Sequence, residues 1–265
     1  MDKLQALQAQ IRKLERVAVA FSSGVDSTFL LQVAHDVLGE TCIAITAVGS
    51  AFSQAEQEEG RRFCKERGIR QISVTTHEME LEDYASNPPD RCYHCKKYIF
   101  TEMMEAAVRA GYTNLLEGSN VDDLGDYRPG MRAITELGIR SPLKEVGLTK
   151  AEIRAYSKEM GLPTAEKPSF ACLATRIPYG ERITPEKLGM IEAAEAVLAS
   201  MGLRQYRVRM HGSMARIEVP ENGMDVVMEQ ANRQHINKRF HELGFTYVSL
   251  DLEGFRSGSM NEGIE

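Results

Sequence analysis

The sequence predicts an α/β protein in which a doubly wound parallel sheet is followed by a smaller α+β domain. Short apolar runs typical of buried strands alternate with helical patterns up to residue 117, whereas the strand patterns after residue 170 lie close together around a short turn. The chain has 265 residues, enough for one large or two small domains with a substantial core. We expect two domains, residues 1–168 and 169–265.

The first domain begins with an amphipathic pattern, because leucine and isoleucine recur at spacings of three and four within residues 2–15. Strands are expected at 17–21, 41–48, 70–75 and 114–117, with helices between them at 28–34, 53–67 and 98–110. In such sheets ligands bind beyond the carboxyl ends of the strands. The ligand site is therefore expected at residues 22–27, 47–52 and 118–128.

The second domain shows a different pattern. Helices are expected at 185–201 and 222–243, and strands at 205–210, 215–219 and 245–250, with a turn at 211–213. We expect these strands to form a small antiparallel sheet in a ferredoxin-like or related arrangement.

Composition limits the class of protein and its partners. The net charge is −6 and the pI about 5.7, which argues against nucleic acid as the main ligand. No apolar run approaches the length of a membrane span, and the N-terminus lacks a signal-peptide core. We therefore expect a cytoplasmic protein without a membrane partner. The five cysteines are an odd number, which favours metal binding or catalysis over a disulfide framework.

The turn between the first strand and the following helix is a candidate phosphate site. Backbone N–H groups at a helix N-terminus bind anions, Gly24 allows close approach, and Ser22 and Ser27 add hydroxyl donors. No lysine follows Gly24, so the Walker pattern is absent. Asp26 would repel phosphate unless a cation lies between them, so it is a helix cap, a magnesium ligand or both. An ordinary capped strand–helix turn is the alternative.

Two further segments are expected at the same edge of the sheet. Ala47 lies near the end of the second strand, and the loop at 116–130 concentrates carboxylates after the fourth. There Gly118 would allow close approach to a base or ribose, and Asp126 and Arg128 are candidates for metal, phosphate or carboxylate contacts. The alternative is a solvated acidic loop.

Three cysteines are candidates for metal binding. Cys92 and Cys95 form a C-x-x-C, whose spacing lets both thiolates reach one metal from a single turn, before the helix expected at 98–110. Cys172 lies near Arg176 in an irregular loop at the domain junction. Three thiolates leave one iron of a cubane cluster open, or leave a zinc site one ligand short that His94 could supply. The other two cysteines, Cys42 and Cys64, are expected to be packing residues.

Arginines are concentrated in the second domain. Arg207 and Arg209 alternate on one face of a strand, and Arg216 lies on the paired strand. Like charges on one face are unfavourable unless an anion lies between them, and a phosphate-bearing substrate would supply one. Arg256, among serines and glycines, is a further candidate for anion binding. Solvated arginines are the alternative.

Several of these motifs together resemble one family over nearly the whole chain. S-S-G-V-D-S resembles the S-G-G-x-D-S pyrophosphate loop of the ATP pyrophosphatase (PP-loop) superfamily, whose fold is of the HUP, or adenine nucleotide alpha hydrolase-like, type. Ser23 stands where that superfamily usually has glycine. With D-Y-R-P-G, A-C-L-A-T-R-I-P-Y-G, R-V-R and L-D-L-E-G-F-R-S-G, the chain resembles the LarE family.

The resemblance implies an ATP-dependent sulfur transferase of nickel-pincer nucleotide cofactor biosynthesis, used by lactate racemase. ATP would adenylylate a carboxylate of pyridinium-3,5-biscarboxylic acid mononucleotide, and sulfur would displace AMP to give a thiocarboxylate. Some members sacrifice a cysteine sulfur, whereas others hold a [4Fe-4S] cluster with three cysteines, whose open iron can bind a donated sulfide. This chain is similar to the second type. The expected cofactors are ATP, Mg²⁺ and the cluster. The expected partners are the nucleotide substrate, sulfide or another sulfur donor, and copies of the chain in a homo-oligomer.

The residue roles that follow are these. Catalysis is assigned to Asp26, Cys172 and Arg176. ATP binding is assigned to Ser22, Ser23, Gly24, Asp26, Ser27, Ala47, Gly118 and Asp126. Substrate binding is assigned to Arg128, Arg176, Arg207, Arg209 and Arg256. The cluster is assigned to Cys92, Cys95 and Cys172, and magnesium to Asp26. The second domain would serve substrate binding and oligomerisation.

Two other functions compete with this one. An iron–sulfur-dependent tRNA thiolase shares the loop and the three cysteines, but the acidic chain has no lysine-rich or aromatic-rich binding module. A non-enzymatic regulator that binds a nucleotide and zinc is the third possibility.

Overall fold

The computed structural model describes residues 2–125, 129–168, 171–256 and 258–261. The chain divides into two compact units. The first comprises Met1–Glu78 and Asp90–Phe170, and the second Met79–Pro89 and Ala171–Glu265. The short segment Met79–Pro89 therefore belongs to the second unit although it interrupts the first in sequence.

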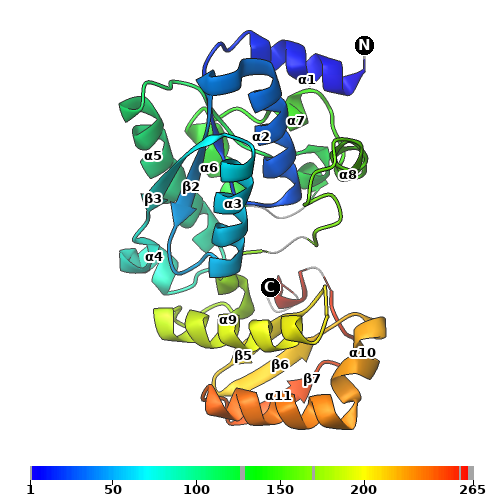
Figure 1. Ribbon diagram of the computed structural model, residues 1–265. Coiled ribbons are helices and arrows are strands. Elements are labelled where there is room, and N and C mark those ends of the chain that lie inside the picture. The colour runs from blue at the N-terminus through cyan, green and yellow to red at the C-terminus, as the bar shows by residue number, and fades with distance from the viewer. Residues whose placement is uncertain (1, 126–128, 169–170, 257, 262–265) are drawn as a thin grey trace. The chain divides into compact units, whose positions relative to one another are not determined.

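The first unit is built on a parallel sheet (Figure 1). Its strands are β1 (Val17–Ala20), β2 (Cys42–Val48), β3 (Arg70–Thr75) and β4 (Leu115–Leu116), in the order β3-β2-β1-β4. All three pairings are parallel, with Ala20 opposite Ile45 and Val19 opposite Leu116. The prediction of an α/β class with a parallel sheet is confirmed.

Alternate residues of β1 enter two different apolar clusters, so both faces of the sheet are covered. Val17 and Val19 pack with residues of α1 (Lys3–Arg12), α2 (Val25–Leu38) and α3 (Gln54–Glu66). Ala18 and Ala20 pack with residues of α5 (Arg91–Arg109) and α6 (Pro129–Glu136). Burial on both faces explains why this strand is apolar throughout.

The β4 strand and its 3-10 turn, η3 (Val121–Gly125), are followed by α6, then by α7 (Pro142–Glu145) and α8 (Lys150–Glu159). Thr149 caps α8, since it accepts a hydrogen bond from the Glu152 backbone while the Glu152 carboxylate accepts from the Thr149 N–H. Hydrogen bonds from Lys3 and the Thr149 backbone lower the pKa of Glu152 to about 2. The first turn of α8 is thus fixed by its capping residue and by Lys3.

The second unit has a mixed three-stranded sheet. Its strands are β5 (Arg207–His211), β6 (Met214–Glu218) and β7 (Tyr247–Leu250), in the order β5-β6-β7. The first pair is antiparallel and the second parallel. The prediction of an antiparallel sheet was therefore wrong for β7. The long helical connection returns the chain to the same end of the sheet, and this makes the next strand parallel.

The helix expected at 222–243 is two helices, α10 (Glu221–Met228) and α11 (Gln230–Glu242), with Glu229 in an extended conformation between them. The unit also contains α9 (Pro185–Ser200), the short helix α4 (Glu82–Ala85), and the 3-10 turns η4 (Leu173–Arg176) and η5 (Ser259–Asn261). Buried Asn87 fixes the Met79–Pro89 segment by donating to the carbonyls of Ile177, Pro178 and Glu181. None of the helices in the described ranges is long and apolar enough to cross a bilayer.

Candidate active site

The loop after β1 leads directly into α2 and brings its polar groups together. The Ser27 hydroxyl accepts from the Ser22 N–H at 3.2 Å, lies 3.0 Å from the Ser22 hydroxyl and donates to the Gly24 carbonyl at 3.3 Å. Gly24 is the N-cap of α2, and no described side chain caps this end of the helix. An N-terminus without a side-chain cap leaves its N–H groups to an anion.

Ser23 adopts the left-handed conformation, with φ +60°. This backbone region favours glycine, the residue usual at this position in PP-loop proteins. The buried Ser23 side chain points toward α3, where a Cβ on Gly60 would overlap the Ser23 hydroxyl. The serine is therefore accommodated by a glycine on the neighbouring helix.

Asp26 lies in the first turn of α2 and is held by two side chains from other segments. Its Oδ2 is 2.5 Å from Nζ of Lys150, and its Oδ1 accepts from the Asn120 amide at 3.3 Å. Lys150 begins α8, and its backbone N–H donates to Asp122 Oδ2 at 2.7 Å. The carboxylate expected to bind magnesium thus faces a lysine that the sequence analysis did not single out.

Gly118 packs against the loop itself. A Cβ added to Gly118 would lie 3.0 Å from the Ser27 nitrogen and 3.2 Å from the Asp26 carbonyl carbon. The preceding residue, Glu117, is buried and accepts hydrogen bonds from the backbone and hydroxyl of Ser119 and from the Ser141 hydroxyl. The glycine therefore permits contact between two protein segments, besides any contact with a nucleotide.

A second lysine touches the loop. Lys167 donates to the Ser23 carbonyl at 3.1 Å and forms ion pairs with Glu56 at 3.2 Å and Glu59 at 2.7 Å. It joins the loop to α3, and its side chain is 13% exposed.

Of the other residues predicted for the site at this edge of the sheet, Ala47 lies within the described part of the chain. Ala47 is buried on β2 beside Val74, near the carboxyl end of the strand. Asp126 and Arg128 lie outside the described residues, so their predicted roles remain predictions.

Cys92 and Cys95 lie in the first turns of α5, which begins at Arg91. The expectation that this motif precedes the helix was wrong. Residues three apart on a helix lie on one face, so the two thiols share a face near the N-terminus, where the helix dipole favours negative charge. Both thiols and that of Cys172 are partly exposed and free of disulfides, whereas Cys42 and Cys64 are buried.

Cys172 belongs to the second unit and the C-x-x-C to the first. A cluster that uses all three therefore remains a prediction. Within the described part of the chain, no group of three or more His, Cys, Asp or Glu side chains is arranged to hold a metal ion.

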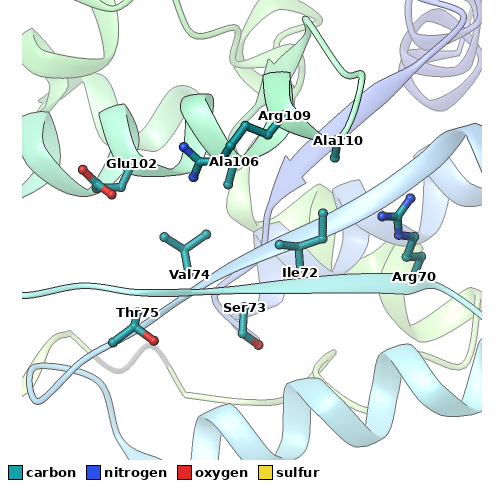
Figure 2. A pocket seen from close by; sticks show the side chains of 9 residues that line it. All are labelled: Arg70, Ile72, Ser73, Val74, Thr75, Glu102, Ala106, Arg109 and Ala110. Atoms are coloured by element: carbon teal, nitrogen blue, oxygen red, sulfur yellow. The ribbon is translucent and has the colours of Figure 1, made fainter.

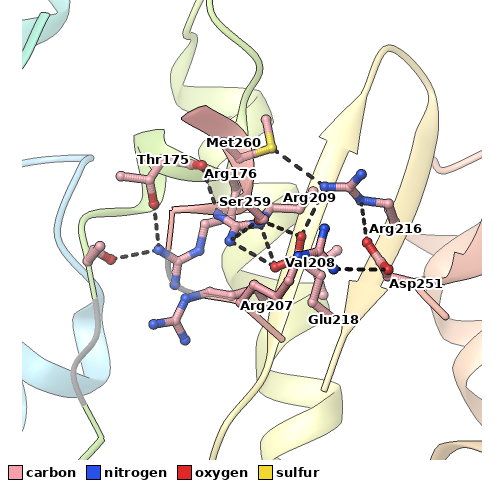
Figure 3. A network of polar contacts seen from close by, with 12 residues as sticks. Thr175, Arg176, Arg207, Val208, Arg209, Arg216, Glu218, Asp251, Ser259 and Met260 are labelled. Atoms are coloured by element: carbon pink, nitrogen blue, oxygen red, sulfur yellow. Dashed lines mark hydrogen bonds and ion pairs between the residues drawn. The ribbon is translucent and has the colours of Figure 1, made fainter. Parts of the chain in front are cut away.

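The arginines of the second unit form a buried network with carboxylates (Figure 3). Arg209 lies opposite Arg216 on β6, and both bind Glu218, Arg209 at 2.8 Å and Arg216 at 2.9 Å. Arg216 also approaches Asp251 at 3.6 Å. The anion expected between these like charges is thus supplied by a glutamate of the protein.

Arg176 is buried and makes five hydrogen bonds within its unit. Two go to Glu195, at 2.8 and 3.0 Å, and one goes to the carbonyl of Cys172 at 3.1 Å. These contacts shape the Cys172 loop.

Arg207 keeps its charge in this setting. It donates to the Tyr206 carbonyl at 2.6 Å, and its guanidinium lies 5.0 Å from the centre of the Phe255 ring. Burial and the nearby Arg176 lower the pKa of Arg207 to about 10, so it remains positive at neutral pH. Arg256 pairs with Asp251 at 3.6 Å and Glu253 at 2.8 Å.

Sequence reasoning missed both buried glutamates of this network. Glu218 follows Arg216 by two positions on β6, so strand periodicity places the two on one face. Glu195 falls on the buried face of α9 with Ile191 and Leu198. The sequence signal for Glu195 was a charged residue at a helical position where apolar residues otherwise recur.

A groove at the edge of the first sheet is separate from these groups. It lies between β3 and α5 and is lined partly by Arg70, Glu102 and Arg109 (Figure 2). None of the residues predicted for the site lines it.

A parallel sheet with the Ser22–Ser27 loop after β1 is consistent with the core of the PP-loop class of α/β proteins. No family model matches the chain. The pyridinium-3,5-bisthiocarboxylic acid mononucleotide synthase of Lactiplantibacillus plantarum is 36% identical over 263 residues, which cover 99% of this chain and 95% of the synthase. The chain therefore belongs to the family of this synthase, the LarE family.

Two further relatives match nearly full length. An uncharacterised protein of Synechocystis is 41% identical over 260 residues, 98% of this chain and 97% of that protein. An uncharacterised protein of Methanocaldococcus jannaschii is 27% identical over 252 residues, 92% of each chain.

Proposed function

We propose that this protein is an ATP-dependent sulfur transferase that acts on pyridinium-3,5-biscarboxylic acid mononucleotide in nickel-pincer cofactor biosynthesis. The full-length similarity to the synthase from Lactiplantibacillus plantarum carries this proposal, since that enzyme is named for the bisthiocarboxylic acid mononucleotide. The first unit would then have the doubly wound PP-loop fold. A carboxylate of the substrate is adenylylated, pyrophosphate leaves, and sulfur replaces AMP on the acyl carbon.

The loop after β1 is the proposed ATP site. The uncapped N-terminus of α2 and the Ser22 and Ser27 hydroxyls offer hydrogen bonds to phosphate oxygens. Asp26 provides a partly exposed carboxylate, the kind of ligand that Mg²⁺ prefers. Magnesium bound there would reduce the repulsion between this carboxylate and the triphosphate. Ser23, Ala47, Gly118 and Asp126 are proposed to contribute to nucleotide binding.

The arginine network of the second unit is the proposed substrate site. Arg176 pairs with Glu195, and Arg209 and Arg216 pair with Glu218. Arg216 also approaches Asp251 (Figure 3). Arg207, which is buried beside this network and remains positive at neutral pH, supports binding of a nucleotide monophosphate. Arg128 and Arg256 are proposed to contact the same phosphate. Arg176, which holds the carbonyl of Cys172, is proposed to position that cysteine as well.

Cys92, Cys95 and Cys172 are the proposed ligands of a [4Fe-4S] cluster. The donor chemistry fits, because all three are partly exposed thiols without a disulfide, and thiolates are the usual ligands of such clusters. Such a cluster, when bound, would supply the carrier for donated sulfide. Iron and sulfide quantification after anaerobic purification tests this assignment. Stoichiometric zinc without iron would instead support the regulator.

The products of ATP turnover test the proposed activity most simply. With the mononucleotide substrate and Mg²⁺ present, we expect AMP and pyrophosphate, and no turnover in Asp26→Ala, which should keep the fold by circular dichroism. A matched control is Asp225→Ala on α10 in the other unit. The appearance of ADP and orthophosphate instead would overturn the adenylylation step.

A further inference from the structure

Glu78 carries a buried carboxyl group that none of the roles assigned above uses. It begins the 3-10 turn η2 (Glu78–Glu80) after β3 and is 1% exposed. Its Oε2 accepts from the Thr76 hydroxyl at 2.7 Å, and its Oε1 accepts from the Ala51 N–H at 3.2 Å. Acceptance at both oxygens is the pattern of an ionised carboxyl group. Burial of such a group beside neutral donors costs free energy, so stability alone does not explain the glutamate.

The carboxyl group fixes the turn that follows β2, at residues 49–52. A Cβ added to Gly49 would lie 2.7 Å from both oxygens of Glu78, closer than real Cβ contacts come. Thr76, which donates to the same carboxyl group, extends the pairing of β3 with β2, because its N–H donates to the Val48 carbonyl at 2.9 Å. The glutamate thus ties the turn to the neighbouring strand, and the glycine leaves room for it.

This turn lies beside the phosphate loop. β1 and β2 are parallel neighbours, and the Phe21 N–H donates to the Ile45 carbonyl at 2.8 Å just before the loop. Since parallel strands end at the same edge of the sheet, a ligand with its phosphates at the N-terminus of α2 has the end of β2 next to it. Val48 and Gly49 are partly exposed and Ser50 is exposed, so the turn is open to a ligand.

On the other side of the loop, the protein itself takes up the space. The strand there is β4, and a Cβ on Gly118 would lie 3.0 Å from the Ser27 nitrogen. The part of ATP beyond the phosphates is therefore expected on the β2 side. We propose that Glu78 is a positioning residue for nucleoside recognition: it holds the turn at 49–52 in the shape that receives the adenosine part of ATP.

This proposal rests on the proposed function, because it assumes that the loop after β1 binds the phosphates of ATP. Glu78 itself is buried and acts through the backbone of Ala51. Hydrogen bonds from a turn to a nucleoside weaken when donor and acceptor move apart beyond about 3.2 Å, so a small displacement of the turn is enough to lose them. Loss of Glu78 should therefore affect the nucleoside and spare the phosphates.

Calorimetric titration with ATP, adenosine and inorganic triphosphate tests the proposal in the wild type, Glu78→Ala, Glu78→Gln and Gly49→Ala. Glu78→Ala should weaken binding of ATP and of adenosine alike, about ten-fold, and leave triphosphate binding unchanged. Glu78→Gln keeps an acceptor for the Ala51 N–H and should recover part of the affinity. Gly49→Ala, whose methyl group overlaps the carboxyl group, should show the same selective loss. The matched control is Glu58→Gln, an exposed glutamate of α3, which should bind all three ligands like the wild type.

Three outcomes would overturn a defined claim. Unchanged adenosine affinity in a folded Glu78→Ala, or no adenosine binding by a wild type that binds triphosphate, would show that Glu78 does not position a nucleoside turn. An equal loss for triphosphate would show that it supports the fold of the whole site. Binding of none of the three ligands by the wild type would contradict the proposed ATP site itself. Thermal unfolding shows which variants are folded, and if Glu78→Ala is not, the same comparison is decided by Glu78→Gln and Gly49→Ala.

Discussion

At the scale of single residues, the buried arginines of β5 differ in the groups that they contact. Glu218 is fully buried and accepts hydrogen bonds from Arg209, Arg216 and Ser259. Arg209 also donates to the Thr175 carbonyl at 2.9 Å, so it joins β5 to the η4 segment. Arg207, on the same strand, has its guanidinium over an aromatic ring. Arg209 therefore binds a carboxylate and a carbonyl of the protein, whereas Arg207 lies over an aromatic ring.

We predict different consequences for the two arginines. Arg209→Ala leaves part of the Glu218 charge unpaired in the interior and should lower the free energy of unfolding by about 3 kcal/mol. Arg207→Ala should cost less stability but weaken binding of the mononucleotide about ten-fold. Urea denaturation and substrate titration measure the two effects. Equal losses of stability, with substrate affinity unchanged in Arg207→Ala, would refute this division.

The buried cysteines give a dependence of stability on pH. Burial raises the pKa of Cys42 and of Cys64 to about 12. In the unfolded chain such thiols ionise near pH 8.5, so above that pH the unfolded state loses protons that the folded state keeps. The free energy of unfolding should then fall with rising pH, by up to about 1.4 kcal/mol per pH unit for each thiol.

The comparison with Cys64→Ala isolates this effect. Urea denaturation from about pH 7.5 to about pH 10 should give a shallower decline in the variant than in the wild type, because one of the two thiols is gone. Identical slopes would show that Cys64 ionises in the folded state as easily as in the unfolded one.

At the scale of elements, the phosphate loop depends on the helix beside it. Ser23 has a positive φ and directs its hydroxyl at Gly60, so α3 must carry a residue without a side chain there. Glycine inside a helix normally lowers its stability by up to about 1 kcal/mol relative to alanine. The close contact with the loop explains this glycine.

A double substitution tests this contact. Gly60→Ala should destabilise the protein and weaken ATP binding, since the methyl group overlaps the Ser23 hydroxyl. Ser23→Gly should relieve the overlap, so the double variant should be more stable than Gly60→Ala alone. Gly189→Ala in α9 is the control, because an added Cβ there meets nothing within 4 Å. If Gly60→Ala is as stable as the wild type, the loop does not pack against α3 in this way.

Most elements could be predicted because their apolar periodicity is local. The four strands of the first sheet and the helix before them follow from the spacing of buried residues. Other features depend on information beyond the local pattern. Glu229 separates two helices although no glycine or proline marks the break, and α5 starts at Arg91 although apolar periodicity begins later. The direction of β7 follows from the helical crossover before it. This direction cannot be predicted from the residue pattern of the strand alone.

The candidate site was predicted in outline only. Asp26 and the serines of the loop were evident from the strand–turn–helix pattern. Lys150 was not, because it lies 124 positions away in sequence and no local pattern links it to Asp26. Glu195 and Glu218 were missed for a related reason, since pairing of buried charges is a tertiary property.

At the scale of the whole molecule, the proposed chemistry divides between the two units. The ATP loop and the C-x-x-C belong to the first, and Cys172 and the arginine network to the second. The proposed sulfur transfer would therefore use groups from both units.

The most direct test of the central claim is mass spectrometry of the mononucleotide after anaerobic incubation with the reconstituted protein, ATP, Mg²⁺ and excess sulfide. We expect replacement of carboxylate oxygen by sulfur, dependent on ATP, with more than one sulfur delivered per chain and Cys172 intact. A substrate of unchanged mass, although the protein binds ATP and the mononucleotide, would contradict the assignment as a sulfur transferase. Delivery that stops at one sulfur per chain, with Cys172 converted to dehydroalanine, would contradict the cysteines' role as carriers.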